Sequence, residues 1–356
     1  MADFMSTPYP SDTDEYSNSV TNTTYSGDQF GRVDGGEFLR KIATVITAVG
    51  IVLNLAFIIV VARHKSMNNH INVYLVNLAV ADLMVVVLAC FGMYTNILSY
   101  LPSNYVGCFF IVLVTMPYYA STAIVSLVVA DRYLAVCQPL WHRVAACRAR
   151  SAKLVTVAWC FSLVYTCIVY LESTIETQGC QLLQGSGESY TINTQGETQT
   201  FLFSEIFKPL PVVLLLICSI VMYTRMIKYV RNQVKFRKQV NSAAVTRSEK
   251  PNQSCVRMNR MVATNTFVFF ICLSPRTSLL IANYIQAAFG LKLFQHPVLT
   301  VASTMLLFTN SCINPLIYNL TNKTYRRAFR EVFFGCLSKS PALDSGKKST
   351  VYNISK

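Results

Sequence analysis

The stretch STAIVSLVVADRYLAVC, residues 121–137, places an acidic and a basic residue directly after ten almost wholly apolar ones. A charged side chain at the depth of a membrane is costly, so it is rare there and has a partner or a function. The pair Asp131–Arg132 therefore lies either in a polar environment at a membrane boundary or at a position where its charges have a function. The rest of the sequence distinguishes these alternatives.

The composition is that of an integral membrane protein. Of the 356 residues, 53% are hydrophobic and 13% are charged, a charged fraction that is about half of that in soluble proteins. The mean hydropathy is +0.39. The net charge of +14 comes from short basic clusters between apolar segments, which set membrane topology and do not build a nucleic-acid surface. Nucleic acid is therefore not an expected partner.

Seven apolar segments are long enough to cross a membrane as helices. They cover residues 42–62, 73–97, 108–136, 153–171, 201–230, 258–287 and 297–320. The sequence therefore predicts an all-α membrane protein, a seven-transmembrane helix bundle over residues 42–320. The polar N-terminus (1–41) and the C-terminal tail (336–356) are expected to be disordered.

The links between these segments differ in positive charge. Links 63–72, 137–152 and 231–257 carry Lys and Arg, whereas links 98–107 and 172–200 carry none. Because positive links stay in the cytosol, we expect the N-terminus outside the cell and the C-terminus inside. The sequon at Asn22 then lies outside and predicts N-glycosylation.

Motifs on these segments together resemble the rhodopsin-like (class A) G-protein-coupled receptors. The residues that carry the resemblance are Asn54, Asp82, Asp131-Arg132-Tyr133, Trp159, Phe269, Pro275 and Asn314-Pro315-Leu316-Ile317-Tyr318. It implies a plasma-membrane receptor, not an enzyme, that binds an extracellular ligand and activates a heterotrimeric G protein. Arrestin and a receptor kinase are further implied partners, and no cofactor is expected.

Other functions are less favoured. A chemosensory receptor of the odorant type has the same fold and is the alternative. A transporter or channel would show internal repeats or a path of charges through the membrane, and the sequence shows neither.

For Asp131 and Arg132 the resemblance implies a switch at the cytosolic end of the third segment. Asp131 holds Arg132 at rest, and Arg132 turns toward the G protein in the active state. The alternative is an anchor that only fixes topology, and the motif in the seventh segment favours the switch. The other residues implied for the switch and the G-protein contact are Tyr133, Tyr223, Asn314, Pro315, Tyr318, Pro139 and Leu140.

Asp82 lies in the middle of its segment and is expected to be buried and functional. The resemblance places Ser121, Asn310, Ser311 and Asn314 around it. This set of oxygen atoms is suited to a hydrated sodium ion, which would act as an allosteric ligand. A protonated carboxyl group in a hydrogen-bond network is the alternative, and the complete set of oxygens favours sodium.

Two positions argue against well-known ligand classes. Val114 stands where amine receptors carry an aspartate, so an ammonium ligand would lack its main partner. Phe308 stands where opsins carry the lysine that binds retinal.

Two cations instead indicate an anionic small molecule or lipid as ligand. Arg276 and Lys208 are expected in the outer half of the bundle, where buried cations need partners. The partner is either a carboxylate or phosphate of the ligand, or internal Glu205 or Glu172. The other expected pocket residues are Val114, Tyr118, Tyr119 and Thr304.

Cys108 and Cys180 both fall on the outer, oxidising side, where a disulfide between them is expected. It would pin the link 172–200 over the mouth of the pocket.

Residues 321–335 read as an amphipathic helix along the inner leaflet, since Tyr325, Phe329 and Phe333 recur on one face. Cys336 follows this helix and is either S-palmitoylated, as a second membrane anchor, or unmodified.

Overall fold

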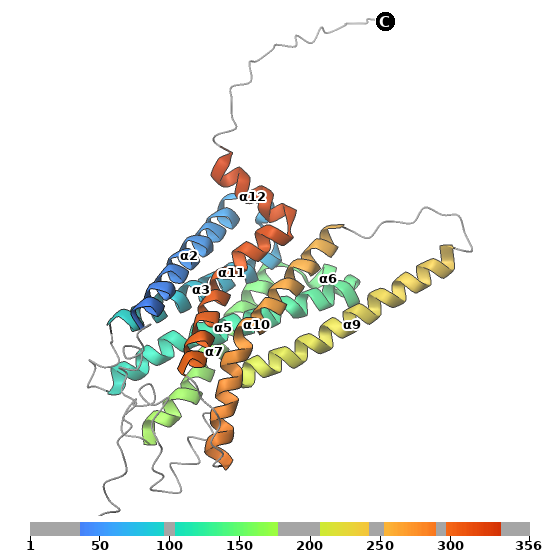
Figure 1. Cartoon of the computed structure of the whole chain (residues 1–356). Helices are drawn as coiled ribbons and strands as arrows, with labels where there is room; N and C mark the ends of the chain where they lie inside the picture. The colour runs from blue at the N-terminus through green and yellow to red at the C-terminus, as the bar shows by residue number, and fades with distance from the viewer. Residues whose placement is uncertain (1–35, 96–103, 177–206, 242–252, 290–296, 336–356) are drawn as a thin grey trace, which may run out of the picture.

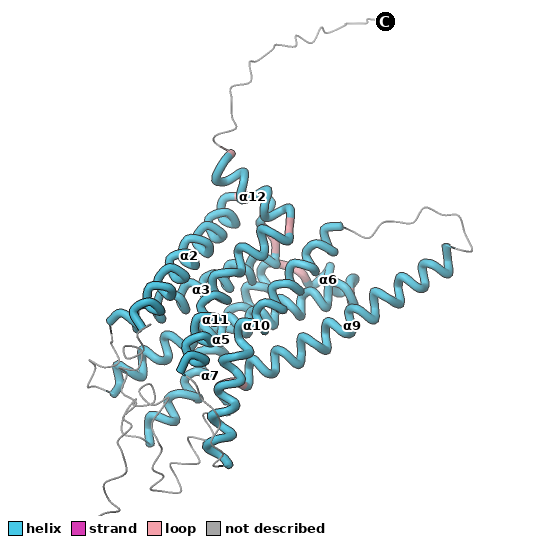
Figure 2. The backbone as a smooth tube through the Cα atoms, in the orientation of Figure 1, coloured by secondary structure: helices cyan, strands magenta, loops and turns pink. Residues whose placement is uncertain are grey.

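A computed structural model of the chain describes residues 36–95, 104–176, 207–241, 253–289 and 297–335. All regular secondary structure in these ranges is helical (Figure 2). The long helices are α2 (Gly36–Arg63), α3 (His70–Thr95), α5 (Asn104–Cys137), α7 (Arg148–Glu176), α9 (Leu210–Asn241), α10 (Gln253–Phe289) and α11 (Pro297–Thr321). The short ones are η1 (Lys65–Met67), α6 (Pro139–Ala145) and α12 (Lys323–Phe334).

Six of the described long helices, all but α11, are apolar and long enough to cross a membrane. α11 has sufficient length at 25 residues but a lower hydropathy, because polar side chains line its inner face. Ser303, Asn310, Ser311 and Asn314 are all buried there. The predicted all-α, seven-helix fold is confirmed, with α11 completing the bundle.

The helices pack around α5. It contacts α3, α7, α9 and α10. α11 contacts α10, α2 and α3 (Figure 1). After α11 the chain turns into α12, which reaches back to α2 (Figure 1). The end of the bundle with η1, α6 and α12 carries Arg63, Lys65, Arg143 and Arg148. We call it the basic end.

Some helix bounds differ from the apolar segments. α7 begins at Arg148 and α9 continues to Asn241, because helical hydrogen bonding extends past the apolar stretch into the polar links. The fifth segment, expected from residue 201, forms α9 only from Leu210. Pro209 and Pro211 flank this start, where a proline fits the first helical turn. Residues 201–206 lie outside the described ranges.

The surface of the bundle carries many large apolar side chains, and its largely apolar core also contains buried polar ones. Val52, Phe161 and Phe267 are 65%, 54% and 66% exposed, whereas Asn54 and Asp82 are fully buried. A soluble protein would not leave so many large apolar side chains in water. An apolar surface of this extent is that of helices surrounded by lipid.

Prolines interrupt three of the long helices at Pro117, Pro275 and Pro315. Each removes a backbone donor and disfavours straight helix geometry. α10, which contains Pro275, changes direction along its length (Figure 1).

Three buried aromatic rings join α2, α11 and α12 at the basic end. The ring centroid of Phe57 lies 5.2 Å from that of Tyr318 and 6.1 Å from that of Tyr325. The Tyr325 hydroxyl donates to Asn72 Oδ1 on α3, and burial raises the pKa of Tyr325. Tyr325, which was predicted to share one face of α12 with Phe329 and Phe333, is thus buried against the bundle.

α12 is fastened to the bundle by polar contacts as well. Asn322 caps its first turn by accepting from the Thr324 backbone N–H at 3.0 Å. Glu331 contacts His64, after α2, at 2.8 Å and accepts from Arg327 at 2.6 Å. These contacts lower the pKa of the Glu331 carboxyl, the hydrogen bond from Arg327 contributing most.

Tyr325 and Tyr318 offer a matched pair of substitutions. Tyr325→Phe leaves Asn72 Oδ1 unpaired in a buried position, which costs about 1–3 kcal/mol, so we expect a lower melting temperature of the purified protein. Tyr318→Phe removes a buried hydroxyl that makes no hydrogen bond within the described part of the chain, so we expect no loss. Equal melting temperatures of the two variants would contradict this assignment of hydroxyl partners.

Candidate functional site

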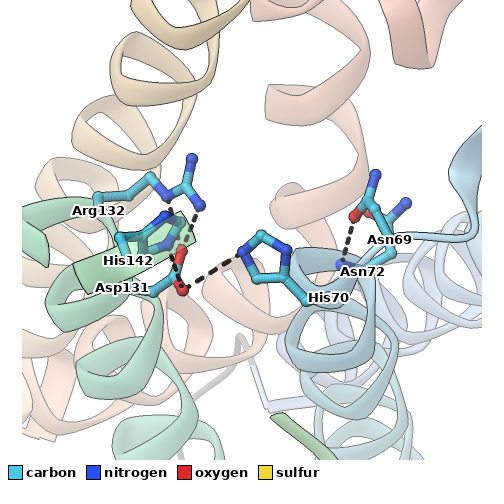
Figure 3. A network of polar contacts seen from close by, with 6 residues as sticks. All are labelled: Asn69, His70, Asn72, Asp131, Arg132 and His142. Atoms are coloured by element: carbon cyan, nitrogen blue, oxygen red, sulfur yellow. Dashed lines mark hydrogen bonds and ion pairs between the residues drawn. The ribbon is translucent and has the colours of Figure 1, made fainter. Parts of the chain in front are cut away.

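Asp131 and Arg132 lie near the end of α5, at the basic end of the bundle. Arg132 Nε donates to Asp131 Oδ2 at 3.1 Å, and Arg132 Nη2 donates to the same oxygen (Figure 3). Arg132 is only 7% exposed. The carboxylate thus pairs with a guanidinium that is buried in the bundle.

The second oxygen of Asp131 faces two histidines. Asp131 Oδ1 lies 3.2 Å from His142 Nε2 of α6 and 3.4 Å from His70 Nε2 of α3 (Figure 3). The two imidazole rings stand edge to face with centroids 5.4 Å apart. The sequence placed these histidines only in or beside links, and no motif signalled that both would meet Asp131.

Local structure positions both histidines. Asn69 Oδ1 accepts from the Asn72 backbone N–H at 3.0 Å (Figure 3), a cap that makes His70 the first residue of α3. α6 begins at Pro139, a residue suited to the first helical turn.

α6 also has a contact with α7, which follows it. The Arg150 guanidinium lies 4.4 Å from the ring centroid of Trp141, a cation–π contact. It holds α6 beside the start of α7.

α6 presents an exposed apolar surface at the basic end. Leu140 is 80% and Val144 88% exposed, beside half-exposed Trp141. Pro139 and Leu140 were expected in a link, and the structure places them in this helix. Exposed apolar side chains beside basic ones are what a docking partner would cover.

Further contacts tie α10 to its neighbours. The Tyr223 hydroxyl of α9 donates to Thr266 Oγ1 of α10 at 3.2 Å, and Arg260 Nη2 donates to the Thr321 carbonyl of α11 at 3.0 Å. A small cavity of about 10 Å³ borders Thr266 and the Tyr318 ring. The sequence did not predict the Arg260 contact. In this arrangement Tyr223 bonds to α10.

The remaining switch residues have different surroundings. Tyr133 is partly exposed on α5, and Pro315 is buried within α11. Asn314 belongs to the polar centre around Asp82.

Asp82 lies fully buried on α3, between α5 and α11. Asn314 Nδ2 donates to Asp82 Oδ2 at 2.6 Å, and Ser121 Oγ donates to Asp82 Oδ1 at 3.4 Å. Ser311 is buried beside this carboxylate. Asn310 is buried, and its Oδ1 has no hydrogen bond among the described residues. The carboxylate and hydroxyl oxygens are of the type that fits a hard cation such as sodium.

The polar centre is also joined to α2. Asn54 Nδ2 donates to the Gly50 carbonyl at 2.9 Å and to the Ser311 carbonyl at 2.8 Å. Asn54 thereby holds α11 against α2 next to Asp82.

Part of the expected ligand pocket serves to hold the start of α9. The Tyr119 hydroxyl donates to the Lys208 carbonyl at 3.2 Å, and the Tyr165 hydroxyl donates to the Phe207 carbonyl at 2.6 Å. Tyr119 is buried between the rings of Tyr118 and Tyr165, with centroids 5.2 and 5.1 Å away. Lys208 itself is 8% exposed.

The other pocket residues lie on three helices. Val114 of α5, Arg276 of α10 and Thr304 of α11 are each partly exposed. Glu205 lies outside the described residues, and the side chain of Glu172 is not described.

Four predicted modification sites cannot be placed. Asn22, Cys180 and Cys336 lie outside the described residues, and Cys108 belongs to α5 without a described side chain.

Comparisons with known proteins agree with this architecture. The family model "7 transmembrane receptor (rhodopsin family)" matches residues 53–318. The chain is 26% identical to the thyrotropin-releasing hormone receptor of Mus musculus, an alignment that covers 82% of this chain and 77% of that receptor. It is 27% identical to neuromedin-U receptor 2 of Mus musculus, covering 81% and 73% of the two chains. It is 29% identical to somatostatin receptor type 5 of Bos taurus, covering 83% and 75%. With a membrane helix bundle, an Asp131–Arg132 pair at one end and a family match over most of its length, the chain belongs to the rhodopsin family of seven-transmembrane receptors.

Proposed function

We propose that this chain is a plasma-membrane receptor that binds an extracellular ligand and activates a heterotrimeric G protein at its basic end. The observation that carries the proposal is the buried Arg132, held by Asp131 beside the exposed apolar face of α6. The resting bundle keeps Arg132 inward, and an agonist that binds the other state more tightly shifts the population. Arrestin and a receptor kinase act on the same end.

The basic end faces the cytosol in this proposal. Arg63, Lys65, Arg143 and Arg148 gather there, and positively charged links remain on the cytosolic side. The N-terminus, with Asn22, then lies outside the cell.

We further propose that the ligand is a peptide messenger with a negatively charged group. The relatives are receptors named for thyrotropin-releasing hormone, neuromedin-U and somatostatin, which favours a hormone-type ligand over a lipid or an odorant. Arg276 of α10, partly exposed, is the residue that pairs with the negative group. Tyr118 and Thr304 supply further contacts.

Sodium is the proposed allosteric ligand of the polar centre. Asp82, Ser121, Ser311 and the free oxygen of Asn310 hold the ion, and Asn314 orients the Asp82 carboxylate. The ion supplies positive charge to a buried carboxylate and thereby stabilises the state in which these groups converge.

The switch predicts a gain of signal. Asp131→Asn weakens the charge-assisted contact that holds Arg132, worth about 1.5–3 kcal/mol, so ligand-independent G-protein activation rises several-fold at equal surface expression. The double variant Asp131→Asn/Arg132→Ala loses this gain, because Arg132 is the group released. A panel of Gα subtypes in cells provides the measurement. Unchanged signalling by Asp131→Asn, or a double variant as active as the single one, contradicts the switch.

The sodium site predicts an ion-specific effect on stability. Sodium chloride raises the melting temperature of the purified wild-type receptor more than choline chloride at the same ionic strength. Asp82→Asn removes the difference between the two salts, since the amide lacks the charge that binds the cation. A difference that persists in Asp82→Asn would place the sodium effect elsewhere.

The ligand contact predicts a loss of potency. For a peptide agonist found by screening the wild type, Arg276→Ala lowers potency at least about tenfold, the scale of one charge-assisted contact. Arg276→Lys, which keeps the charge, retains part of it. Full potency of Arg276→Ala at equal surface expression would show that Arg276 does not bind the ligand.

A further inference from the structure

The proposed Arg132 switch does not account for the positions of His70 and His142 beside Asp131. The switch requires only Asp131 Oδ2, which accepts from Arg132. Asp131 Oδ1 points instead toward the two imidazole rings (Figure 3). One ligand-type atom from each of the three residues lies within 4.8 Å of the other two.

We propose that these three residues form a binding site for a divalent transition-metal ion, with zinc as the best match. Two imidazole nitrogens and one carboxylate oxygen are a ligand set that zinc takes with its fourth position open. The ion bridges α3, α5 and α6. This site is separate from the sodium site at Asp82 and does not depend on the identity of the receptor's ligand.

The distances fit a tetrahedral metal site. With zinc–ligand bonds of about 2.1 Å, two ligands of a tetrahedral site are about 3.4 Å apart. The observed separations from Asp131 Oδ1 are 3.2 Å to His142 and 3.4 Å to His70. The His142 contact is also a hydrogen bond, and a bound ion would take its place.

One nitrogen makes a long contact with the carboxylate. His70 Nε2 is shielded from solvent, and it lies 3.4 Å from its partner, Asp131 Oδ1. Charge-assisted hydrogen bonds from nitrogen to a carboxylate are shorter, at about 2.7–2.9 Å. An ion between the two atoms would bond directly to the neutral nitrogen and to the carboxylate.

The surroundings support the site in two further ways. The side chains of His70, Asp131 and His142 are 21%, 10% and 15% exposed, so an ion is partly shielded yet can enter from solvent. The Asn69 cap fixes His70, and the arginine on Oδ2 fixes the carboxylate plane. Such outer contacts hold metal ligands in place.

A nearby histidine provides the matched control. His64 lies at the same end and contacts Glu331 at 2.8 Å. It has one carboxylate partner and does not belong to a group of three ligands among the described residues. His64→Gln therefore removes a histidine–carboxylate contact without touching the proposed site.

The experiment measures binding of zinc chloride to the purified full-length receptor in lipid nanodiscs by calorimetry. We expect saturable binding by the wild type and by His64→Gln, and at least about tenfold weaker binding by His70→Gln and by His142→Gln. Glutamine keeps an N–H donor for Asp131 but is a poor zinc ligand. The melting temperature without zinc shows whether each variant is folded.

Cobalt(II) spectroscopy of the wild type identifies the ligands of the bound ion, even if a variant does not fold. A four-coordinate cobalt spectrum with nitrogen and oxygen ligands, displaced by zinc, supports the site. The proposal is overturned by any of three results: no saturable binding, a thiolate-to-cobalt band that places the ion on a cysteine, or an equal loss of affinity in His64→Gln.

Discussion

The two oxygens of the Asp131 carboxylate organise the basic end of the bundle. Oδ2 accepts from Arg132 on the same helix, and Oδ1 faces His142 of α6 and His70 of α3. A carboxylate has enough lone pairs for all these partners at once. Three helices meet at this carboxylate. A change in its charge or in its bound partners therefore shifts the equilibrium between the resting and active states, as does a ligand bound elsewhere in the bundle.

The fold was predictable because a membrane imposes simple rules on sequence. Length and hydropathy locate the helices that face lipid, such as α2 and α7, and positive charge marks one end. α11 is less apolar because Asn310 and Asn314 are buried in the interior, yet its apolar length was still sufficient to predict it as a crossing segment. The sequence did not predict where helices continue past the apolar stretch. It also did not predict that part of a link forms the helix α6, because such a helix depends on packing against other elements.

Contacts between residues of known motifs were predictable from the sequence. Contacts that arise only when the folded chain brings distant residues together were not. Asp131 and Arg132 are neighbours in sequence, and Asp82 and Asn314 belong to motifs of the family. His70 and His142 carry no such signal, since 72 positions separate them and each adjoins a link. Only the packing of α3 against α5, and of α6 against α5, places both beside one carboxylate.

α6 is a helix that depends on its surroundings. It has seven residues and none of them is buried, whereas isolated helices shorter than about 12–15 residues are marginal in water. Its order therefore depends on the His142 contact with Asp131 and on the Arg150 contact with Trp141. When the Asp131 contact is released, the segment with Leu140 and Val144 gains conformational entropy. A protein that binds this segment in its helical form must then order it, which costs free energy. The affinity of the docking surface thus varies with the state of one carboxylate, even if its own side chains stay the same.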